Sequence, residues 1–308
     1  MVFPGQGSQS QGMQADLAAQ FPIVLETYAE ASEVLEYDLW KLVQDGPAEK
    51  LGETLVTQPA MLAAGVAAYR VWLAAGGSTP AQMAGHSLGE YTALVCAGAV
   101  GFTDAMRVVK RRSELMQAAV PVGIGAMAAV LGLDDDKIIS LCNEASTIGV
   151  AEPVNFNSPG QVVIAGHATA VNQAVEYAKD HGARRAILLP VSVPSHSSLM
   201  REAGVSLAET LDATDFRTPD VTVVSAATAE PYVDGSDIRS KLSTQVYSPV
   251  LWVRTVEALV NAGARSIIEC GPGKVLAGLI RRISKSTPVA IIDSLDGLQK
   301  ALQADENN

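Results

Sequence analysis

The stretch QMAGHSLGEYTALV at residues 82–95 decides the fold of the chain. It begins with apolar residues that predict a short buried strand, and it ends in an Ala-rich segment that predicts a helix. Between them lies Gly85-His86-Ser87-Leu88-Gly89, in which small residues two positions either side of the serine permit a sharp strand-to-helix turn. The pattern therefore predicts an α/β fold with Ser87 as an exposed nucleophile. The alternative is an ordinary turn in which Ser87 caps the helix.

The segments around this turn alternate between apolar strands and helical patterns, which predicts a mainly parallel sheet. Between residues 123 and 189 the order becomes β-α-β-β-α-β, as in a ferredoxin-like unit. We therefore predict an α/β protein with a large α/β-hydrolase-like subdomain formed by 1–122 and 190–308. A small ferredoxin-like subdomain at 123–189 is inserted into it. The polar tail at 303–308 is predicted to be disordered.

The composition excludes several classes of protein. A length of 308 residues with 48% hydrophobic residues is enough for a full core. A formal net charge of −11 argues against nucleic-acid binding, which needs clustered cations. The first residues do not resemble a signal peptide, and the apolar segments are Ala- and Gly-rich, so no membrane span is expected. Three cysteines without a CxxC pattern suggest neither a zinc site nor a disulfide framework, and fit a cytoplasmic protein.

A serine nucleophile needs a base, and the chain has four histidines. His86 precedes the serine in an extended strand end, so its side chain should point away from it. His167 and His181 lie at the two ends of a helix predicted in the inserted unit. His196 is expected to follow a strand of the large unit at 191–193, where catalytic groups gather. We predict His196 as the base, with a structural or helix-capping histidine as the alternative. No histidine has metal-ligand spacing.

One arginine lies on the apolar side of the helix predicted from Thr103 to Val120. Arg112 falls on the apolar stripe, whereas Lys110 and Arg111 do not. A buried arginine requires an anion, because an unpaired buried charge is very unfavourable. Two interpretations follow from this position. Arg112 either pairs with an internal Asp or Glu, or binds a carboxylate of the substrate.

These motifs together resemble the malonyl-CoA:acyl carrier protein transacylase family of fatty-acid synthesis. The matching segments span nearly the whole chain in the family's order. They are FPGQGSQ at 3–9, QPA at 58–60, GHSLGEY at 85–91, RRSELMQ at 111–117, NFNSPGQVVIAG at 155–166, VPSHS at 193–197, Gln245 before YSPV at 247–250, and ECGPGKVL at 269–276.

The resemblance implies a ping-pong acyltransferase. Malonyl would pass from coenzyme A to Ser87, and then to the phosphopantetheine thiol of acyl carrier protein, with His196 as the base. The coenzyme A thioester is then a substrate, and neither a permanently bound cofactor nor a metal is implied. The resemblance also implies that the backbone N–H groups of Gln6 and Leu88 form the oxyanion hole. It implies that the backbone carbonyl of Gln245 holds the histidine. Arg112 would bind the malonyl carboxylate.

Two departures from the family leave points open. The first strand is shorter than in the family, which leaves its pairing at the sheet edge open. The Val193–Ser195 segment fits the stand-alone enzymes, but it also resembles polyketide acyltransferases that use branched extender units. An acyltransferase for another extender acyl group in polyketide synthesis therefore remains an alternative.

Two other functions compete with acyl transfer. A serine thioesterase or esterase shares the G-x-S-x-G pattern, but a simple hydrolase has no need for Arg112. A non-catalytic carrier-binding module would not need Ser87 and His196.

Two cationic groups stand out in this acidic chain. One comprises Arg107, Lys110 and Arg111, and the other comprises Lys274, Arg281, Arg282 and Lys285. Because acyl carrier proteins are usually acidic, we predict that the second group docks the carrier. The alternative is that both groups only solvate helix faces.

Overall fold

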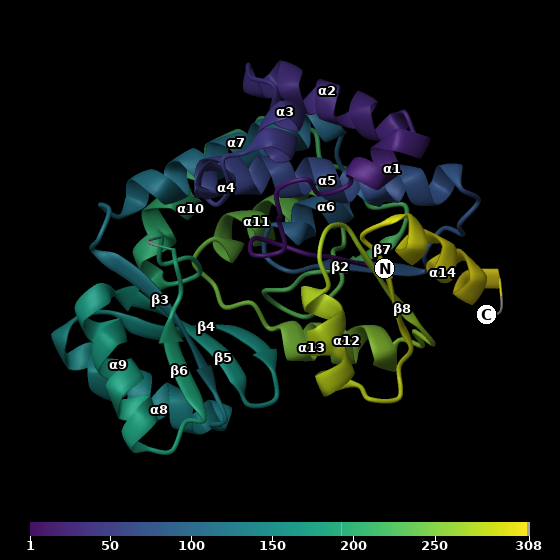
Figure 1. Ribbon diagram of the computed structural model, residues 1–308. Coiled ribbons are helices and arrows are strands. Elements are labelled where there is room, and N and C mark those ends of the chain that lie inside the picture. The colour runs from purple at the N-terminus through teal and green to yellow at the C-terminus, as the bar shows by residue number, and fades with distance from the viewer. Residues whose placement is uncertain (192, 307–308) are drawn as a thin grey trace.

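The computed structural model describes residues 1–191 and 193–306. A five-stranded parallel sheet forms its larger part, in the order β7-β2-β1-β8-β9, with helices above and below it in Figure 1. The strands are Val2–Phe3 (β1), Gln82–Gly85 (β2), Thr222–Val224 (β7), Ile267–Cys270 (β8) and Val289–Ile292 (β9). The predicted α/β class with a mainly parallel sheet is confirmed.

The helices around this sheet come from both ends of the chain. Those before residue 122 are Ala15–Gln20 (α1), Ile23–Leu35 (α2), Leu39–Asp45 (α3), Ala48–Leu51 (α4), Thr54–Ala74 (α5), Gly89–Cys96 (α6) and Phe102–Ala119 (α7). Those after residue 190 are Ser198–Met200 (η2, a 3₁₀ turn), Arg201–Asp212 (α10), Gly235–Gln245 (α11), Trp252–Asn261 (α12), Val275–Ile283 (α13) and Leu295–Glu306 (α14). None of the helices in the described ranges combines the length and hydrophobicity needed to cross a bilayer.

Helix α5 forms the centre of the main core. Small and apolar residues surround it, so nearly its whole circumference is buried, as the sequence predicts. Its neighbours are α2, α6 and α7. This packing fixes α7, which carries Arg112, against the helix that follows Ser87.

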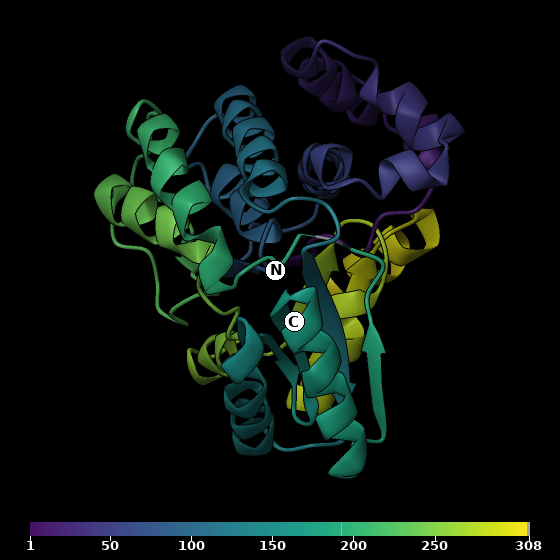
Figure 2. The same cartoon turned by 90° about the vertical axis from the view of Figure 1, so that its left-hand side faces the viewer.

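The second sheet is antiparallel, has the order β4-β5-β3-β6 and lies apart from the first (Figures 1 and 2). Its elements are Gly125–Leu131 (β3), Asp135–Ala145 (α8), Ser146–Ile148 (η1, a 3₁₀ turn), Ala151–Ser158 (β4), Gln161–His167 (β5), Ala168–Asp180 (α9) and Arg185–Leu188 (β6). The βαββαβ order and antiparallel pairing confirm the predicted ferredoxin-like unit. Because its two helices and the sheet enclose a core of their own, we propose that 123–189 is a separate subdomain.

The two parts are joined by backbone hydrogen bonds next to the end of α11. Val250 donates its N–H to the carbonyl of Val154 over 2.8 Å, and Phe156 donates to the carbonyl of Val250 over 2.9 Å. A segment of the large part thus extends along β4 of the small sheet. This contact holds the chain just after Gln245 in a defined position.

Two expectations about the chain ends require correction. The short first strand does not lie at an edge, because β1 pairs with both β2 and β8 in the middle of the sheet. The tail is not disordered over 303–306, because α14 continues to Glu306. Its apolar side packs Leu298 and Ala301 into the main core, which stabilises the helix to its end. Residues 307–308 lie outside the described residues.

Candidate active site

Ser87 occupies the predicted turn between β2 and α6. Its φ of 52° is left-handed, a conformation that costs a non-glycine residue roughly 1–3 kcal/mol and is concentrated at functional sites. The turn is so tight that a Cβ on Gly85 would lie 1.9 Å from the backbone carbonyl carbon of Gly89. The small residues of the motif are therefore needed for close packing.

His196 lies next to Ser87 although 109 positions separate them in the sequence. The Oγ of Ser87 is 2.7 Å from Nε2 of His196. On the other side of the ring, Nδ1 of His196 is 2.9 Å from the backbone carbonyl of Gln245. A carbonyl only accepts hydrogen bonds, so Nδ1 carries the proton and Nε2 is free to accept the serine proton. This is the tautomer that a general base requires.

The sequence predicts that His196 directly follows a strand of the large sheet at 191–193. The last strand before His196 is β6 of the small sheet, which ends at Leu188, and the described residues between the two contain no further strand. The expected strand at 191–193 includes residue 192, which lies outside the described residues. His196 is held instead by a loop with a left-handed φ of 68° and by its N–H, which donates to the carbonyl of Val246.

The imidazole of His196 is 3% exposed. Burial, and then the nearby cation of Arg112, lower the pKa of His196 to about 3. A neutral ring is therefore maintained at physiological pH, which keeps Nε2 available as a proton acceptor.

Arg112 is 1% exposed and lies behind Ser87. Its Nη1 donates to Oε1 of Gln58 over 2.6 Å, and its Nη2 donates to Oε1 of Gln245 over 3.1 Å. Nη2 also lies 3.4 Å from the Oγ of Ser87. Within the described part of the chain, no carboxylate forms an ion pair with this guanidinium, and its Nε has no hydrogen-bond partner. The internal ion pair considered as an alternative is therefore absent from these residues.

Two backbone N–H groups near the serine have no partner in the described residues. They belong to Gln6 and Leu88. The loop containing Gln6 passes so close to the turn that a Cβ on Gly5 would lie 2.5 Å from the carbonyl oxygen of His86 and 3.7 Å from the nitrogen of Leu88. Free donors beside a nucleophile are what a developing oxyanion requires.

A cavity of about 310 Å³ opens over Ser87 and His196. Its lining comes from the first loop, the serine turn, the small sheet and the loop before His196: Gln6, Gly7, Gln9, Gly52, Thr54, His86, Ser87, Met127, Asn155, Leu189, Pro190, Val191, Val193, Ser195 and His196. Arg112 is not among them, but its Nη2 lies 3.4 Å from the Oγ of Ser87. The cavity therefore has a reactive serine on its wall and a cation behind it.

The other histidines lie where the sequence places them. Nε2 of His86 lies 2.8 Å from Oδ1 of Asn157, and the residue lines the cavity beside Ser87. His167 and His181 flank α9, far along the chain from the serine turn. No group of three His, Cys, Asp or Glu side chains suited to a metal ion occurs among the described residues.

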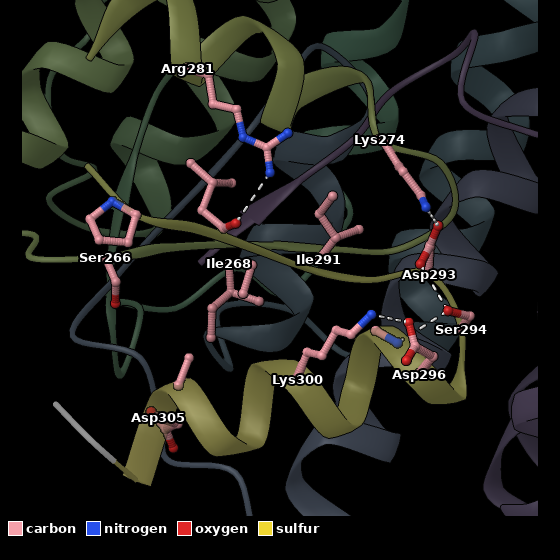
Figure 3. A pocket seen from close by; sticks show the side chains of 15 residues that line it. Ser266, Ile268, Lys274, Arg281, Ile291, Asp293, Ser294, Asp296, Lys300 and Asp305 are labelled. Carbon is pink, nitrogen blue, oxygen red and sulfur yellow. Dashed lines mark hydrogen bonds and ion pairs between the residues drawn. The ribbon is translucent and has the colours of Figure 1, made fainter. Parts of the chain in front are cut away.

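The four predicted docking residues do not form one uniform patch. Arg281 and Lys274 line a separate cavity of about 420 Å³ beside β9 and α14, where Lys274 lies 3.5 Å from Asp293 (Figure 3). Arg282 contacts the small sheet instead, where it donates a hydrogen bond to Oε1 of Gln161 over 2.6 Å. Lys285 is exposed. The cavity in Figure 3 contains paired charges but no nucleophile with a base, so we do not assign chemistry to it.

Two buried polar residues of the site have no assigned role in the sequence interpretation. Gln58 is the only strongly polar residue in the first turns of the apolar α5. A polar residue in such a segment could have indicated, from the sequence alone, that Gln58 has a role at the site. Glu90 lies three residues after Ser87, is fully buried and contacts Gln245. Nothing in the sequence indicates that it faces Gln245, because that contact depends on the tertiary fold.

Comparisons with known proteins place this chain in one family over nearly its whole length. Residues 1–304 match the family model described as acyl transferase domain. The chain is 53% identical over 302 residues to the malonyl CoA-acyl carrier protein transacylase of Escherichia coli (strain K12), covering 98% of each sequence. It is 42% identical over 303 residues to the protein of the same name from Bacillus subtilis (strain 168), covering 98% of this chain and 95% of that one.

Two solved structures are also similar. The malonyl CoA-acyl carrier protein transacylase of Coxiella burnetii is 46% identical with a TM-score of 0.97, covering 98% of this chain and 96% of that one. A malonyl-transacylase in complex with its type II PKS acyl-carrier protein is 51% identical with a TM-score of 0.97, covering 100% of this chain and 99% of that one. Similarity at this level extends over the whole of both chains.

Proposed function

Because this chain belongs to the acyl transferase domain family, we propose that it transfers malonyl from coenzyme A to an acyl carrier protein. The acyl group would be carried as an ester on Ser87. One observation supports this most strongly: the Oγ of Ser87 lies 2.7 Å from the base Nε2 of His196 and 3.4 Å from the guanidinium of Arg112. A nucleophile, a base and a carboxylate ligand are thus close together.

In the first half-reaction, the Oγ of Ser87 attacks the thioester carbonyl carbon of malonyl-CoA. Its proton moves to Nε2 of His196, whose cation is stabilised by the carbonyl of Gln245. The N–H groups of Gln6 and Leu88 would stabilise the oxyanion. The C–S bond then breaks, and the leaving sulfur takes the proton from His196.

The second half-reaction reverses these steps with a different thiol. The phosphopantetheine thiol gives its proton to His196 and attacks the ester carbonyl. The Ser87 oxygen leaves and regains the proton. Because the same groups serve both halves, no further base or resident cofactor is needed.

Arg112 would provide the choice of acyl group. A malonyl carboxylate can replace the neutral oxygens that now surround the guanidinium and use its unpartnered Nε. This argues against a simple thioesterase or esterase, for which a buried cation beside the nucleophile would only be unfavourable.

The proposed function is tested by brief exposure of the protein to an equimolar mixture of malonyl-CoA, methylmalonyl-CoA and acetyl-CoA. Mass spectrometry should detect a malonyl ester on Ser87 that persists until a carrier thiol is added. Rapid release of free malonate without a thiol would instead identify a hydrolase. A dominant methylmalonyl ester would support the alternative extender group, and an unmodified serine without any release of free acid would contradict all three.

The buried base leads to a pH prediction. Since burial and Arg112 lower the pKa of His196 to about 3, the acylation rate constant kcat/KM should stay level between about pH 5 and pH 8. Acylation should slow only at lower pH, where the base becomes protonated. Rapid-quench measurements across this range test it, and a loss of rate centred near pH 6.5 would contradict it. In Arg112→Ala, loss of the neighbouring cation should raise the pKa and move the decline to higher pH.

We also propose that Arg281 and Arg282 dock the acidic carrier. Reversing both charges, in Arg281→Glu/Arg282→Glu, should slow transfer to the carrier by about tenfold or more and leave acylation by malonyl-CoA unchanged. The matched control is Arg107→Glu/Arg111→Glu, which changes the net charge equally on α7. Stopped-flow measurement of each half-reaction separates the two effects. Equal slowing of both halves, or the same effect in the control, would refute docking at α13.

We propose that the protein acts in the cytoplasm. The support is chemical: Cys96, Cys142 and Cys270 are free thiols, and the last two are buried. Free thiols in an α/β enzyme are typical of a reducing compartment.

A further inference from the structure

Glu90 is a fully buried acid in the first turn of α6. Its two carboxyl oxygens accept hydrogen bonds from the hydroxyl of Tyr232 and from Nε2 of Gln245, the latter over 2.7 Å. Burial raises the pKa of Glu90, and the hydrogen bonds from Tyr232 and Gln245 oppose the increase. A group surrounded only by donors is suited to the ionised carboxylate.

The side chain of Gln245 connects Glu90 to the reactive groups. Its Nε2 donates both to Glu90 and, over 2.9 Å, to the backbone carbonyl of Ser87. Its Oε1 accepts from Nη2 of Arg112 over 3.1 Å. Only one orientation of the amide satisfies both sides, because the carboxylate and carbonyl need a donor while the guanidinium needs an acceptor. One amide therefore joins an anion to a cation.

None of the carboxylates in the described residues forms an ion pair with Arg112. Its direct hydrogen-bond acceptors in the described residues are neutral: Gln58, Gln245 and Ser87. Burial lowers the pKa of Arg112, and Tyr91 and then the charge of Glu90 oppose this effect, so Glu90 is the carboxylate that contributes. In the free enzyme, the buried cation of Arg112 is therefore balanced by the carboxylate of Glu90, and the amide of Gln245 lies between the two.

We propose that Glu90, acting through the amide of Gln245, is the counter-charge of Arg112 in the acyl-free enzyme and sets how strongly the site prefers a charged acyl group. This rests on the proposed function. When the malonyl carboxylate binds Arg112, two anions share one buried cation, so the charge of Glu90 weakens binding of the malonyl group. Glu90 is therefore a positioning and specificity residue that does not touch the substrate.

The test is Glu90→Gln, which keeps the shape of the side chain and removes its charge. We expect the ratio of acylation kcat/KM for malonyl-CoA to that for acetyl-CoA to rise by about tenfold, equivalent to about 1.4 kcal/mol. A merely structural role would instead slow both substrates equally. An unchanged or lower ratio in a folded variant would overturn the proposal.

Two controls separate charge from packing. Tyr232→Phe removes one hydrogen bond but keeps the carboxylate, so the ratio should stay near that of the wild type. Glu269→Gln removes another fully buried carboxylate, which caps α13 through the N–H groups of Leu276 and Ala277, and should also leave the ratio unchanged. A tenfold rise in either control would overturn the assignment to Glu90.

A stability measurement covers the case in which Glu90→Gln folds poorly. Removing both charges, in Glu90→Gln/Arg112→Gln, leaves neither ion uncompensated, so the double variant should unfold at a higher temperature than Glu90→Gln alone. A double variant at least as unstable as the single one would refute the coupling. Malonyl labelling of wild-type Ser87 tests the proposed function separately, so its failure is distinguishable from failure of this inference.

Discussion

Replacing Ser87 with alanine is expected to abolish the malonyl ester and to reduce transfer by roughly a millionfold, as for removal of other activated serines. The reason is that the Oγ is the atom that bonds to the acyl carbon, and its hydroxyl is the proton donor that lies 2.7 Å from the base Nε2 of His196. Incubation with malonyl-CoA followed by intact-protein mass spectrometry measures the ester directly.

Histidine variants provide the controls for this experiment. His196→Ala should reduce acylation to a similar extent, because nucleophile and base act as a unit. His181→Ala removes an exposed histidine at the end of α9 and should leave acylation unchanged. An ester that forms at normal speed in Ser87→Ala would assign the chemistry to another residue.

Replacing Arg112 with alanine should weaken malonyl transfer by about 2–5 kcal/mol, the usual effect of truncating one member of a buried charge pair. That range corresponds to roughly 30- to 5,000-fold in kcat/KM. Transfer of uncharged acyl groups should be affected much less, because these groups have no carboxylate that binds Arg112. Parallel kinetics with malonyl-CoA and acetyl-CoA measure this difference.

Arg111→Ala is a matched control on the same helix. Its guanidinium is half-exposed and contacts Glu114, so both substrates should react as in the wild type. Arg112→Lys should restore only part of the malonyl activity, because an ammonium cannot form the planar two-pronged contact of a guanidinium. Full malonyl activity in Arg112→Ala would refute the carboxylate-binding role.

Local sequence patterns were sufficient for much of the fold. The 85–89 turn could be identified because its steric demands are confined to five residues. The ferredoxin-like unit could be identified because its elements follow one another without interruption. Family membership is confirmed by the match over residues 1–304.

Features that depend on long-range packing were harder to predict. The central position of β1 depends on β8, which lies far along the chain. His196 was predicted from a strand expected at 191–193, a stretch that includes residue 192 outside the described residues, whereas its observed position depends on the carbonyls of Gln245 and Val246. Periodicity placed Arg112 on a buried face of its helix. It could not predict that the partners of Arg112 are neutral, because Gln58 and Gln245 reach it from other helices. Glu90 is missed for the same reason.

The pairing of β1 with β8 also determines when the enzyme can become active during synthesis. The ribosome releases β2 early, yet the neighbour on the other side of β1 emerges only with residues 267–270. At ~5–20 residues per second, roughly 10–40 s separate these events. Throughout that interval the first strand of the nascent polypeptide has one unsatisfied flank, so chaperone protection is most needed then, and a prematurely terminated chain has a permanently open sheet.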